Sequence, residues 1–140
     1  MAQLKYYHYD FSAMGSPCSI QLYARHEKKA KRAAKSVMDD VCRLEAKYSR
    51  YRTDSFLSDI NRIAKQGDRI RVDDETAGLL DYANTCYQQS DGLFDITSGI
   101  LRRAWDFKSG NIPDPEVIQL LLNKIGWHKI SWQRPVLRFM

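Results

Sequence analysis

Residues Ser90–Gly99 read S-D-G-L-F-D-I-T-S-G, and this stretch decides how the middle of the chain folds. It separates two amphipathic helical patterns, because Gly92 suits the left-handed end of a helix and Leu93–Thr97 has no helical periodicity. Small residues, a carboxylate and accessible backbone are the features of a turn that holds a ligand. We therefore expect a helix before the stretch, an irregular ligand-binding turn within it, and a short helix around Ile100–Ala104.

Downstream of this turn, the sequence predicts one more helix and two strands. Asp114-Pro115-Glu116 is a helix start, because the cap comes first and proline occupies the first helical position. Apolar residues follow at helical spacing, and Gly126 is expected to end the helix. Trp127–Trp132 and Val136–Met140 have the character of strands, and a turn at Gln133-Arg134-Pro135 would join them.

Upstream, the strongest pattern is a helix over Glu27–Tyr48, whose apolar residues recur every three or four positions and form one stripe. A shorter helix follows, with possible N-caps at Thr53-Asp54-Ser55 and an end at Gly67. Arg69–Val72 alternates like a strand. Asp73 is then expected to cap the helix that leads into the turn.

The N-terminal residues predict a β-hairpin. Leu4–Phe11 is rich in aromatic residues, Cys18–Leu22 alternates with a period of two, and Ala13–Pro17 contains turn residues. Antiparallel strands are thus expected at both ends of the chain, with helices packed between them, which is an α+β fold. The sequence contains no repeat and no interdomain linker, so we expect residues 1–140 to belong to a single domain.

The composition is that of a globular protein, with 140 residues, 44% hydrophobic and 28% charged. The net charge of +5 allows an anionic partner. Basic residues in Arg25–Lys35 and aromatic and basic residues in Tyr48–Arg52 read first as solvated surface, with nucleic-acid binding as a lesser alternative. Cys18, Cys42 and Cys86 are scattered, which argues against a disulfide framework or a zinc site.

The two ends of the sequence bear on its compartment and completeness. No apolar run is long enough to span a bilayer, and the first residues lack the apolar core of a signal peptide. These features favour a cytoplasmic protein or one whose leader has been removed, and the compartment stays unknown. The chain ends inside the apolar run Val136–Met140, where an unfinished strand would leave an unpaired sheet edge. We therefore expect an incomplete domain, the N-terminal part of a longer protein.

Asp95 is the first candidate for contact with a ligand. It lies between Phe94 and Ile96, and a carboxylate between large apolar residues should be buried and hydrogen-bonded. It either caps the following helix or binds backbone N–H groups, or it accepts a hydrogen bond from a ligand. The residues alone leave both readings open.

Met14-Gly15-Ser16 and Tyr51 leave a similar choice. The glycine serves a hairpin reversal or lets the backbone face a planar ligand, and Tyr51 packs within the fold or stacks on a ring system. The three histidines are isolated and suggest no Ser–His–Asp or Cys–His set. Neither the G-x-G-x-x-G and Walker A phosphate-binding motifs nor the H-E-x-x-H metal motif is present.

Three blocks, in this order, carry a resemblance to one family of flavin-handling enzymes. They are Ala13–Ser16; Tyr48–Tyr51 with Ser55, Ser58 and Asn61; and Ser90–Thr97 with Trp105 and Phe107. Together they are similar to the FAD:protein FMN transferases, the ApbE family, formerly called thiamine biosynthesis lipoproteins. The resemblance covers most of the chain and implies an α+β fold of the ApbE type, similar to the T-fold.

The resemblance also implies an activity. Members of the family bind FAD and Mg²⁺, cleave the pyrophosphate of FAD, and attach FMN through a phosphoester to a Thr hydroxyl of a target flavoprotein. Matched residue by residue, the positions that would contact FAD are Met14, Tyr51, Leu93, Phe94 and Asp95. The metal ligands and catalytic residues of the family would lie in a C-terminal half beyond this chain. We therefore expect no metal ligand here, and no turnover by this chain alone, because phosphoryl transfer depends on the metal.

The alternative to a transferase is a truncated, non-catalytic module that binds flavin, and a basic nucleic-acid-binding protein is a weaker one. The resemblance implies FAD and a flavoprotein with an acceptor Thr as partners, without nucleic acid, and the oligomeric state, a dimer included, stays open. Family members are often periplasmic or membrane-anchored, but this sequence carries no lipoprotein signal. We also expect Asp95→Ala to lower the FAD affinity of the intact protein more than its stability.

Overall fold

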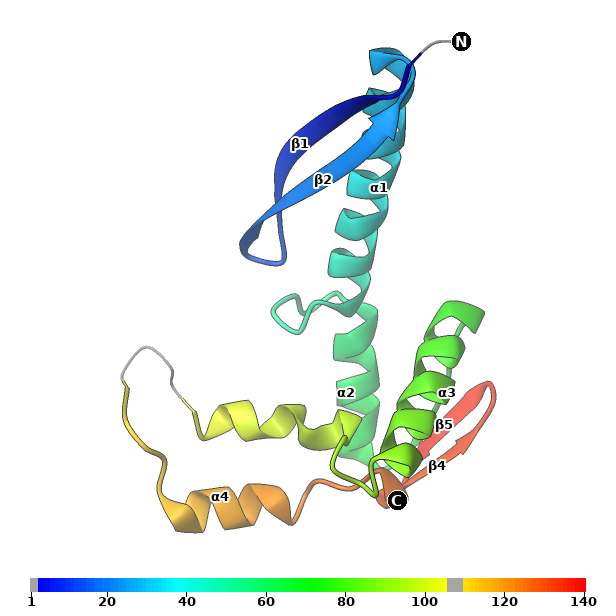
Figure 1. Cartoon of the computed structure of the whole chain (residues 1–140). Coiled ribbons are helices and arrows are strands. Elements are labelled where there is room, and N and C mark those ends of the chain that lie inside the picture. Colours follow the sequence, from blue (N-terminus) through cyan, green and yellow to red (C-terminus); the bar gives the residue numbers. More distant parts are fainter. Residues whose placement is uncertain (1–2, 106–109) are drawn as a thin grey trace. The chain divides into compact units, whose positions relative to one another are not determined.

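The structure, a computed structural model, describes residues 3–105 and 110–140 (Figure 1). The chain divides into two compact units, a first unit of Met1–Arg62 and a second unit of Ile63–Met140. That both belong to one domain stays a prediction. The elements, in chain order, are β1 (Lys5–Ala13), β2 (Ser16–Ala24), α1 (Glu27–Tyr48), α2 (Phe56–Gln66), β3 (Arg69–Arg71), α3 (Asp74–Gln89), the 3-10 helix η1 (Ile96–Arg103), α4 (Pro115–Leu122), the 3-10 turn η2 (Trp127–Lys129), β4 (Ile130–Gln133) and β5 (Val136–Phe139).

The first unit is an antiparallel hairpin that lies along one long helix (Figure 1). In β1 and β2 every second side chain is at least half-buried, because successive side chains point to opposite faces of a strand. Ala30 and Ala34 of α1 are fully buried, and their small side chains let the hairpin approach the helix closely. On the outer face of the hairpin, the rings of Tyr6 and Tyr23 meet edge to face at 5.6 Å.

The helical prediction for Glu27–Tyr48 is confirmed at both ends. Of its apolar stripe, Ala30 and Ala34 are buried and Val37 is exposed, and the lysines near its start are also exposed. The Ser55 hydroxyl accepts a hydrogen bond from the Ser58 amide at 3.1 Å, which is the expected side-chain cap at the start of α2.

The second unit packs α3 beside a three-stranded antiparallel sheet in the order β3-β5-β4. Asp73 caps α3 as predicted, since its Oδ1 accepts the Thr76 amide at 2.9 Å. The carboxylate of Asp81 then fastens α3 to the β4–β5 hairpin: it accepts hydrogen bonds from the Trp132 indole at 2.7 Å and from the Arg134 guanidinium at 2.9 Å. The core of this unit includes Val72, Ala77, Leu80, Ala83, Leu121, Trp127 and Leu137.

The predicted α+β class, with antiparallel strands toward both ends of the chain, is therefore confirmed. Three boundaries differ from the prediction by three residues or more. The short helix begins at Ile96 rather than near Ile100, α4 ends at Leu122 rather than at Gly126, and the strand expected from Trp127 begins at Ile130. The first and the third of these differences lie where η1 and η2 are tied together by hydrogen bonds described below. None of the helices in the described part of the chain has the length and apolarity to cross a bilayer.

Candidate functional site

The predicted turn between β1 and β2 has a strained backbone. Met14 and Gly15 both have positive φ angles, 55° and 68°, and the strand register closes around them with Ala13 opposite Ser16. Two positive φ values in a two-residue hairpin loop suit Asn-Gly, and a methionine at the first position is strained by about 1 kcal/mol. The Met14 side chain is nevertheless 66% exposed, and open space surrounds the place where a Cβ on Gly15 would lie. The turn thus offers a methionine and bare backbone to an outside molecule.

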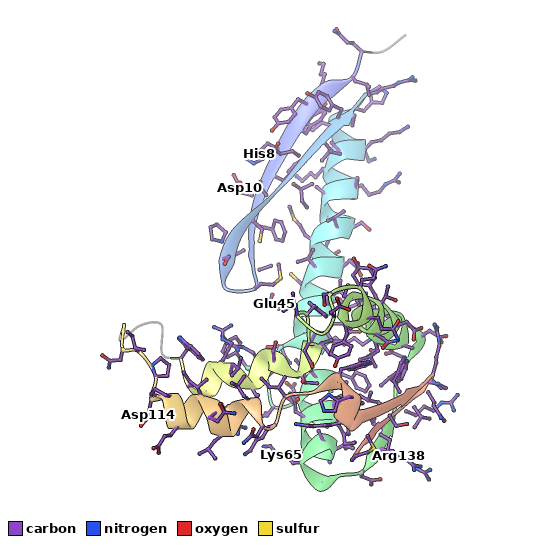
Figure 2. The ribbon with its side chains drawn as sticks, turned by 60° about the horizontal axis from the view of Figure 1, so that its bottom comes forward. His8, Asp10, Glu45, Lys65, Asp114 and Arg138 are labelled. Carbon is purple, nitrogen blue, oxygen red and sulfur yellow. The ribbon has the colours of Figure 1, made fainter. Side chains whose placement is uncertain are left out.

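A side chain from α1 holds this turn. The Met14 amide donates a hydrogen bond to Glu45 Oε1 at 2.8 Å, across 31 residues of sequence. Figure 2 shows Glu45 on α1 next to the tip of the hairpin. His8 and Asp10, labelled in the same figure, lie farther along β1 and pair with each other at 3.3 Å. The sequence did not single out Glu45.

Tyr51 belongs to the loop between α1 and α2, and its side chain is 80% exposed. The Arg50 guanidinium lies over the Tyr51 ring, 4.5 Å from its centroid, and also donates a hydrogen bond to the Tyr51 hydroxyl. Arg50 belongs to the second sequence block, but the sequence assigned it no role beside Tyr51. Its contact leaves Tyr51 a restricted orientation despite the exposure.

Two serines shape the loop that carries Tyr51. The buried Ser55 hydroxyl donates to the Ser49 carbonyl at 2.5 Å, and the Ser58 hydroxyl donates to the Arg52 carbonyl at 2.6 Å. Both bonds fold the loop back onto the start of α2. Ser55 and Ser58 in the second sequence block therefore have a structural role, and Asn61 is exposed on α2.

The Ser90–Gly99 segment begins with the helix stop that the sequence predicted. Gly92 has φ 80°, and its amide donates to the Tyr87 carbonyl at 2.9 Å. The Ser90 hydroxyl accepts the Phe94 amide at 2.9 Å, which holds the next residues in place. Leu93 is 93% exposed and Phe94 is also exposed, so a fixed backbone presents two large apolar side chains to solvent. Trp105 is likewise exposed, whereas Phe107 of the same block lies outside the described residues.

Asp95 binds backbone N–H groups of its own chain. Its Oδ1 accepts the Thr97 amide at 2.8 Å and the Thr97 hydroxyl at 2.6 Å, and its Oδ2 accepts the Trp127 amide at 2.8 Å. The Thr97 hydroxyl in turn accepts the Gly126 amide at 2.9 Å. The structural reading of Asp95, as a helix cap and backbone acceptor, is thus confirmed, while contact with a ligand stays a prediction.

This network explains both the charge of Asp95 and the shifted boundaries. Partial burial acts to raise the pKa of the Asp95 carboxyl, but hydrogen bonds from Thr97 and Trp127, together with nearby His128, lower it below its ordinary value of 3.8. Because Gly126 and Trp127 donate to this network, they belong neither to α4 before them nor to β4 after them. The Trp127 indole also donates to Asn84 Oδ1 of α3 at 2.8 Å, which joins three elements at one point.

The predicted site residues fall into two sets. Met14 and Tyr51 belong to the first unit, whereas Leu93, Phe94 and Asp95 are consecutive in the second. Four of the five side chains are exposed, and Asp95 is partly buried. Among residues 3–105 and 110–140, no three His, Cys, Asp or Glu side chains gather in a group that could hold a metal ion.

Comparisons with known proteins identify the family of the chain. A sequence model described as the ApbE family matches residues 14–139. A curated FAD:protein FMN transferase from Chlamydia pneumoniae is 31% identical over 106 residues, which cover 73% of this chain and 33% of that relative.

Solved structures share the fold. They include the ApbE protein from Thermotoga maritima (22% identity, TM-score 0.77, 96% of this chain and 45% of the other), the apo form of Pseudomonas stutzeri flavinyl transferase ApbE (22%, 0.76, 99% and 48%) and flavin transferase ApbE from Vibrio cholerae (19%, 0.79, 98% and 46%). The chain spans about half the length of these solved proteins. Because the family model spans residues 14–139, this chain belongs to the ApbE family.

Proposed function

We propose that this chain contributes FAD-contacting residues to an FAD:protein FMN transferase. In the proposed reaction, a Thr hydroxyl of a target flavoprotein attacks the FMN phosphorus of FAD. The pyrophosphate bond breaks, AMP leaves with the bond electrons, the hydroxyl proton is lost, and a phosphoester joins FMN to the protein. FAD is therefore a substrate in this proposal, and the flavoprotein is the second substrate.

The observation that carries the proposal is the exposure of Met14, Tyr51 and Leu93 on backbone that the fold holds in place. All three positions lie within the region matched by the family model. The isoalloxazine ring is flat and largely apolar on its faces, so an exposed tyrosine ring and a thioether suit it. The open space over Gly15 allows a planar ring to approach the backbone closely.

For Asp95 we propose a role in shaping the FAD contact rather than in chemistry. Its carboxylate already holds Thr97 and Trp127, so it fixes the end of the segment that presents Leu93 and Phe94. The proposed dependence on Mg²⁺ rests only on the resemblance to the family, because the described residues form no group that could hold the metal.

The test combines binding and transfer. FAD is titrated against the 140-residue chain, and quenching of flavin fluorescence is followed. The chain, and any longer product of its reading frame, is then incubated with FAD, Mg²⁺ and a flavoprotein domain that carries an acceptor Thr, and mass spectrometry looks for added FMN. A matched acceptor with Thr replaced by Val and a sample with EDTA serve as controls.

Each outcome has a defined meaning. Saturable FAD binding with an FMN adduct that depends on both Thr and Mg²⁺ supports the proposal. Binding without an adduct on several targets favours the non-catalytic flavin-binding module. If neither binding nor transfer occurs, the proposal is wrong.

A further inference from the structure

The two strands of the hairpin offer the Met14 amide no hydrogen-bond acceptor. The β1–β2 register ends at the pair Ala13–Ser16, so Met14 lies outside both strands and the ladder supplies it no acceptor. An amide in this position ordinarily binds water. Here it binds the Glu45 carboxylate at 2.8 Å, which is a charge-assisted hydrogen bond.

The geometry of the first unit brings these two residues together. From Ser16 to Ala24, β2 runs for about 27 Å at the usual rise of a strand, and from Glu27 to Glu45 α1 runs for about the same distance at 1.5 Å per residue. Since the chain reverses between β2 and α1, the tip of the hairpin reaches the helical turn that carries Glu45. Figure 1 shows the hairpin lying along α1, and Figure 2 shows Glu45 next to the tip of the hairpin.

The backbone of the turn shows why a clamp is useful. Met14 adopts a positive φ of 55°, which side chains with a Cβ disfavour, and it stays 66% exposed rather than packing into the fold. Strained residues persist where surrounding contacts hold them, and they gather at functional positions. The hydrogen bond to Glu45 of α1 is a contact from another element that holds Met14 in this conformation.

We propose that Glu45 is a positioning residue for flavin binding. Its carboxylate fixes the Met14–Gly15 turn in the strained conformation that presents the methionine side chain and the open face of the glycine. This inference rests on the proposed function, because Met14 is the residue proposed to touch FAD. Glu45 itself acts through the turn and contacts no flavin in this proposal.

The experiment compares Glu45→Ala and Glu45→Gln in the 140-residue chain. Glutamine keeps an acceptor oxygen in the same place, whereas alanine removes it. Asp40→Ala is the matched control, because it also removes one carboxylate from α1. The Asp40 carboxylate accepts its hydrogen bond from Arg43 on the same helix. Amide exchange measured by NMR without ligand reports the clamp, and an FAD titration reports its consequence.

Glu45→Ala is expected to accelerate exchange of the Met14 amide by about tenfold, because a hydrogen bond to a charged group is lost. Exchange at Tyr9 and Ile20 in the middle of the ladder should stay within about twofold, which separates a local effect from general unfolding. FAD affinity should fall by about tenfold in Glu45→Ala and by less than about threefold in Glu45→Gln and Asp40→Ala.

Unchanged Met14 exchange in Glu45→Ala would overturn the clamp. Faster exchange with unchanged FAD affinity would overturn the positioning role, even if the hydrogen bond exists. Failure of the unmodified chain to bind FAD, together with no transfer by the chain or a longer product, would instead overturn the proposed function, and the positioning role with it. The ligand-free exchange data distinguish that failure from failure of the clamp.

Discussion

The Met14–Gly15 turn and the Ser90–Gly99 segment both present exposed side chains on a fixed backbone, but they are fixed differently. In the turn of the first unit, the strained Met14 donates its amide hydrogen bond to the Glu45 carboxylate of α1. The segment of the second unit is held by Ser90 at its start and by the network of Asp95 at its end. The comparison teaches that exposure of a candidate site residue says little about how its backbone is supported. We expect substitutions in the second unit to affect stability, and those in the turn to affect binding.

Asp95→Ala should have the largest effect on stability. It removes the cap of η1 and leaves the Trp127 amide without its acceptor, and together these losses are expected to lower the free energy of unfolding by about 2–3 kcal/mol. Urea unfolding followed by tryptophan fluorescence measures it, because Trp105, Trp127 and Trp132 all lie in the second unit. This outcome would reverse the expectation from the sequence, which placed the larger effect on FAD affinity.

Asp95→Asn is the matched variant, since asparagine keeps one acceptor oxygen and loses the charge. We expect it to lie between the wild-type protein and Asp95→Ala. A loss below about 0.5 kcal/mol in Asp95→Ala, accompanied by weaker FAD binding, would show that Asp95 serves the ligand and not the fold.

The same carboxylate predicts a dependence of stability on acid pH. The pKa of Asp95 in the folded chain lies below its ordinary value of 3.8, so its contribution is fully present above that ordinary value. The contribution is lost as the pH falls from there through the pKa of the folded state. Urea unfolding between about pH 6 and pH 2.5 should therefore show a gap between the wild-type protein and Asp95→Asn that narrows toward the acid end. A gap of constant size would mean that the charge of Asp95 does not contribute.

Local sequence signals predicted most of the fold. The apolar stripe of α1 predicted both ends of this helix, and the alternating pattern predicted the hairpin. Asp73 and Gly92 predicted where α3 begins and ends. Each of these signals acts over a few neighbouring residues. They fixed the element types and, for most elements, their ends.

The remaining boundaries and the supports of the site depend on contacts between distant residues. The late start of β4 follows from hydrogen bonds that join Thr97 to Gly126, 29 positions away, and Asp95 to Trp127, 32 positions away. Glu45 is 31 residues from Met14 and lies beside the apolar stripe of α1, where it reads as an ordinary helix-surface carboxylate. A single sequence contains the two partners but no sign that they meet, so Glu45 was not predicted. Contact of Met14, Tyr51 and Asp95 with FAD stays a prediction.

Tyr51→Ala tests the other residue of the first unit that is proposed to contact FAD. Its side chain is 80% exposed, so the free energy of unfolding should change by less than about 0.5 kcal/mol. Loss of a stacking ring should weaken FAD binding by about fivefold to tenfold in a fluorescence titration. Tyr82→Ala, at a tyrosine that is also exposed but lies on α3, is the control and should leave FAD affinity unchanged. An equal loss in both variants would remove Tyr51 from the proposed contact set.

Met14→Asn should change stability modestly, with a sign opposite to that of Asp95→Ala. Asparagine tolerates a positive φ at the first position of this turn, so relief of strain is expected to stabilise the first unit by about 0.5–1 kcal/mol. The backbone amide remains and can still donate to Glu45. Exchange of hairpin amides measures the stability, because the first unit contains no tryptophan.

The FAD affinity of Met14→Asn should nevertheless fall by about threefold or more, since the thioether contact is lost. Met140→Asn replaces another exposed methionine, outside the proposed contact set, and should change neither quantity. A variant that gains stability while losing affinity would show that the methionine is kept at a strained position for binding. If FAD affinity is retained, the turn contributes only its backbone to FAD binding. The difference between the turn and the Ser90–Gly99 segment then rests on the hydrogen bond to Glu45.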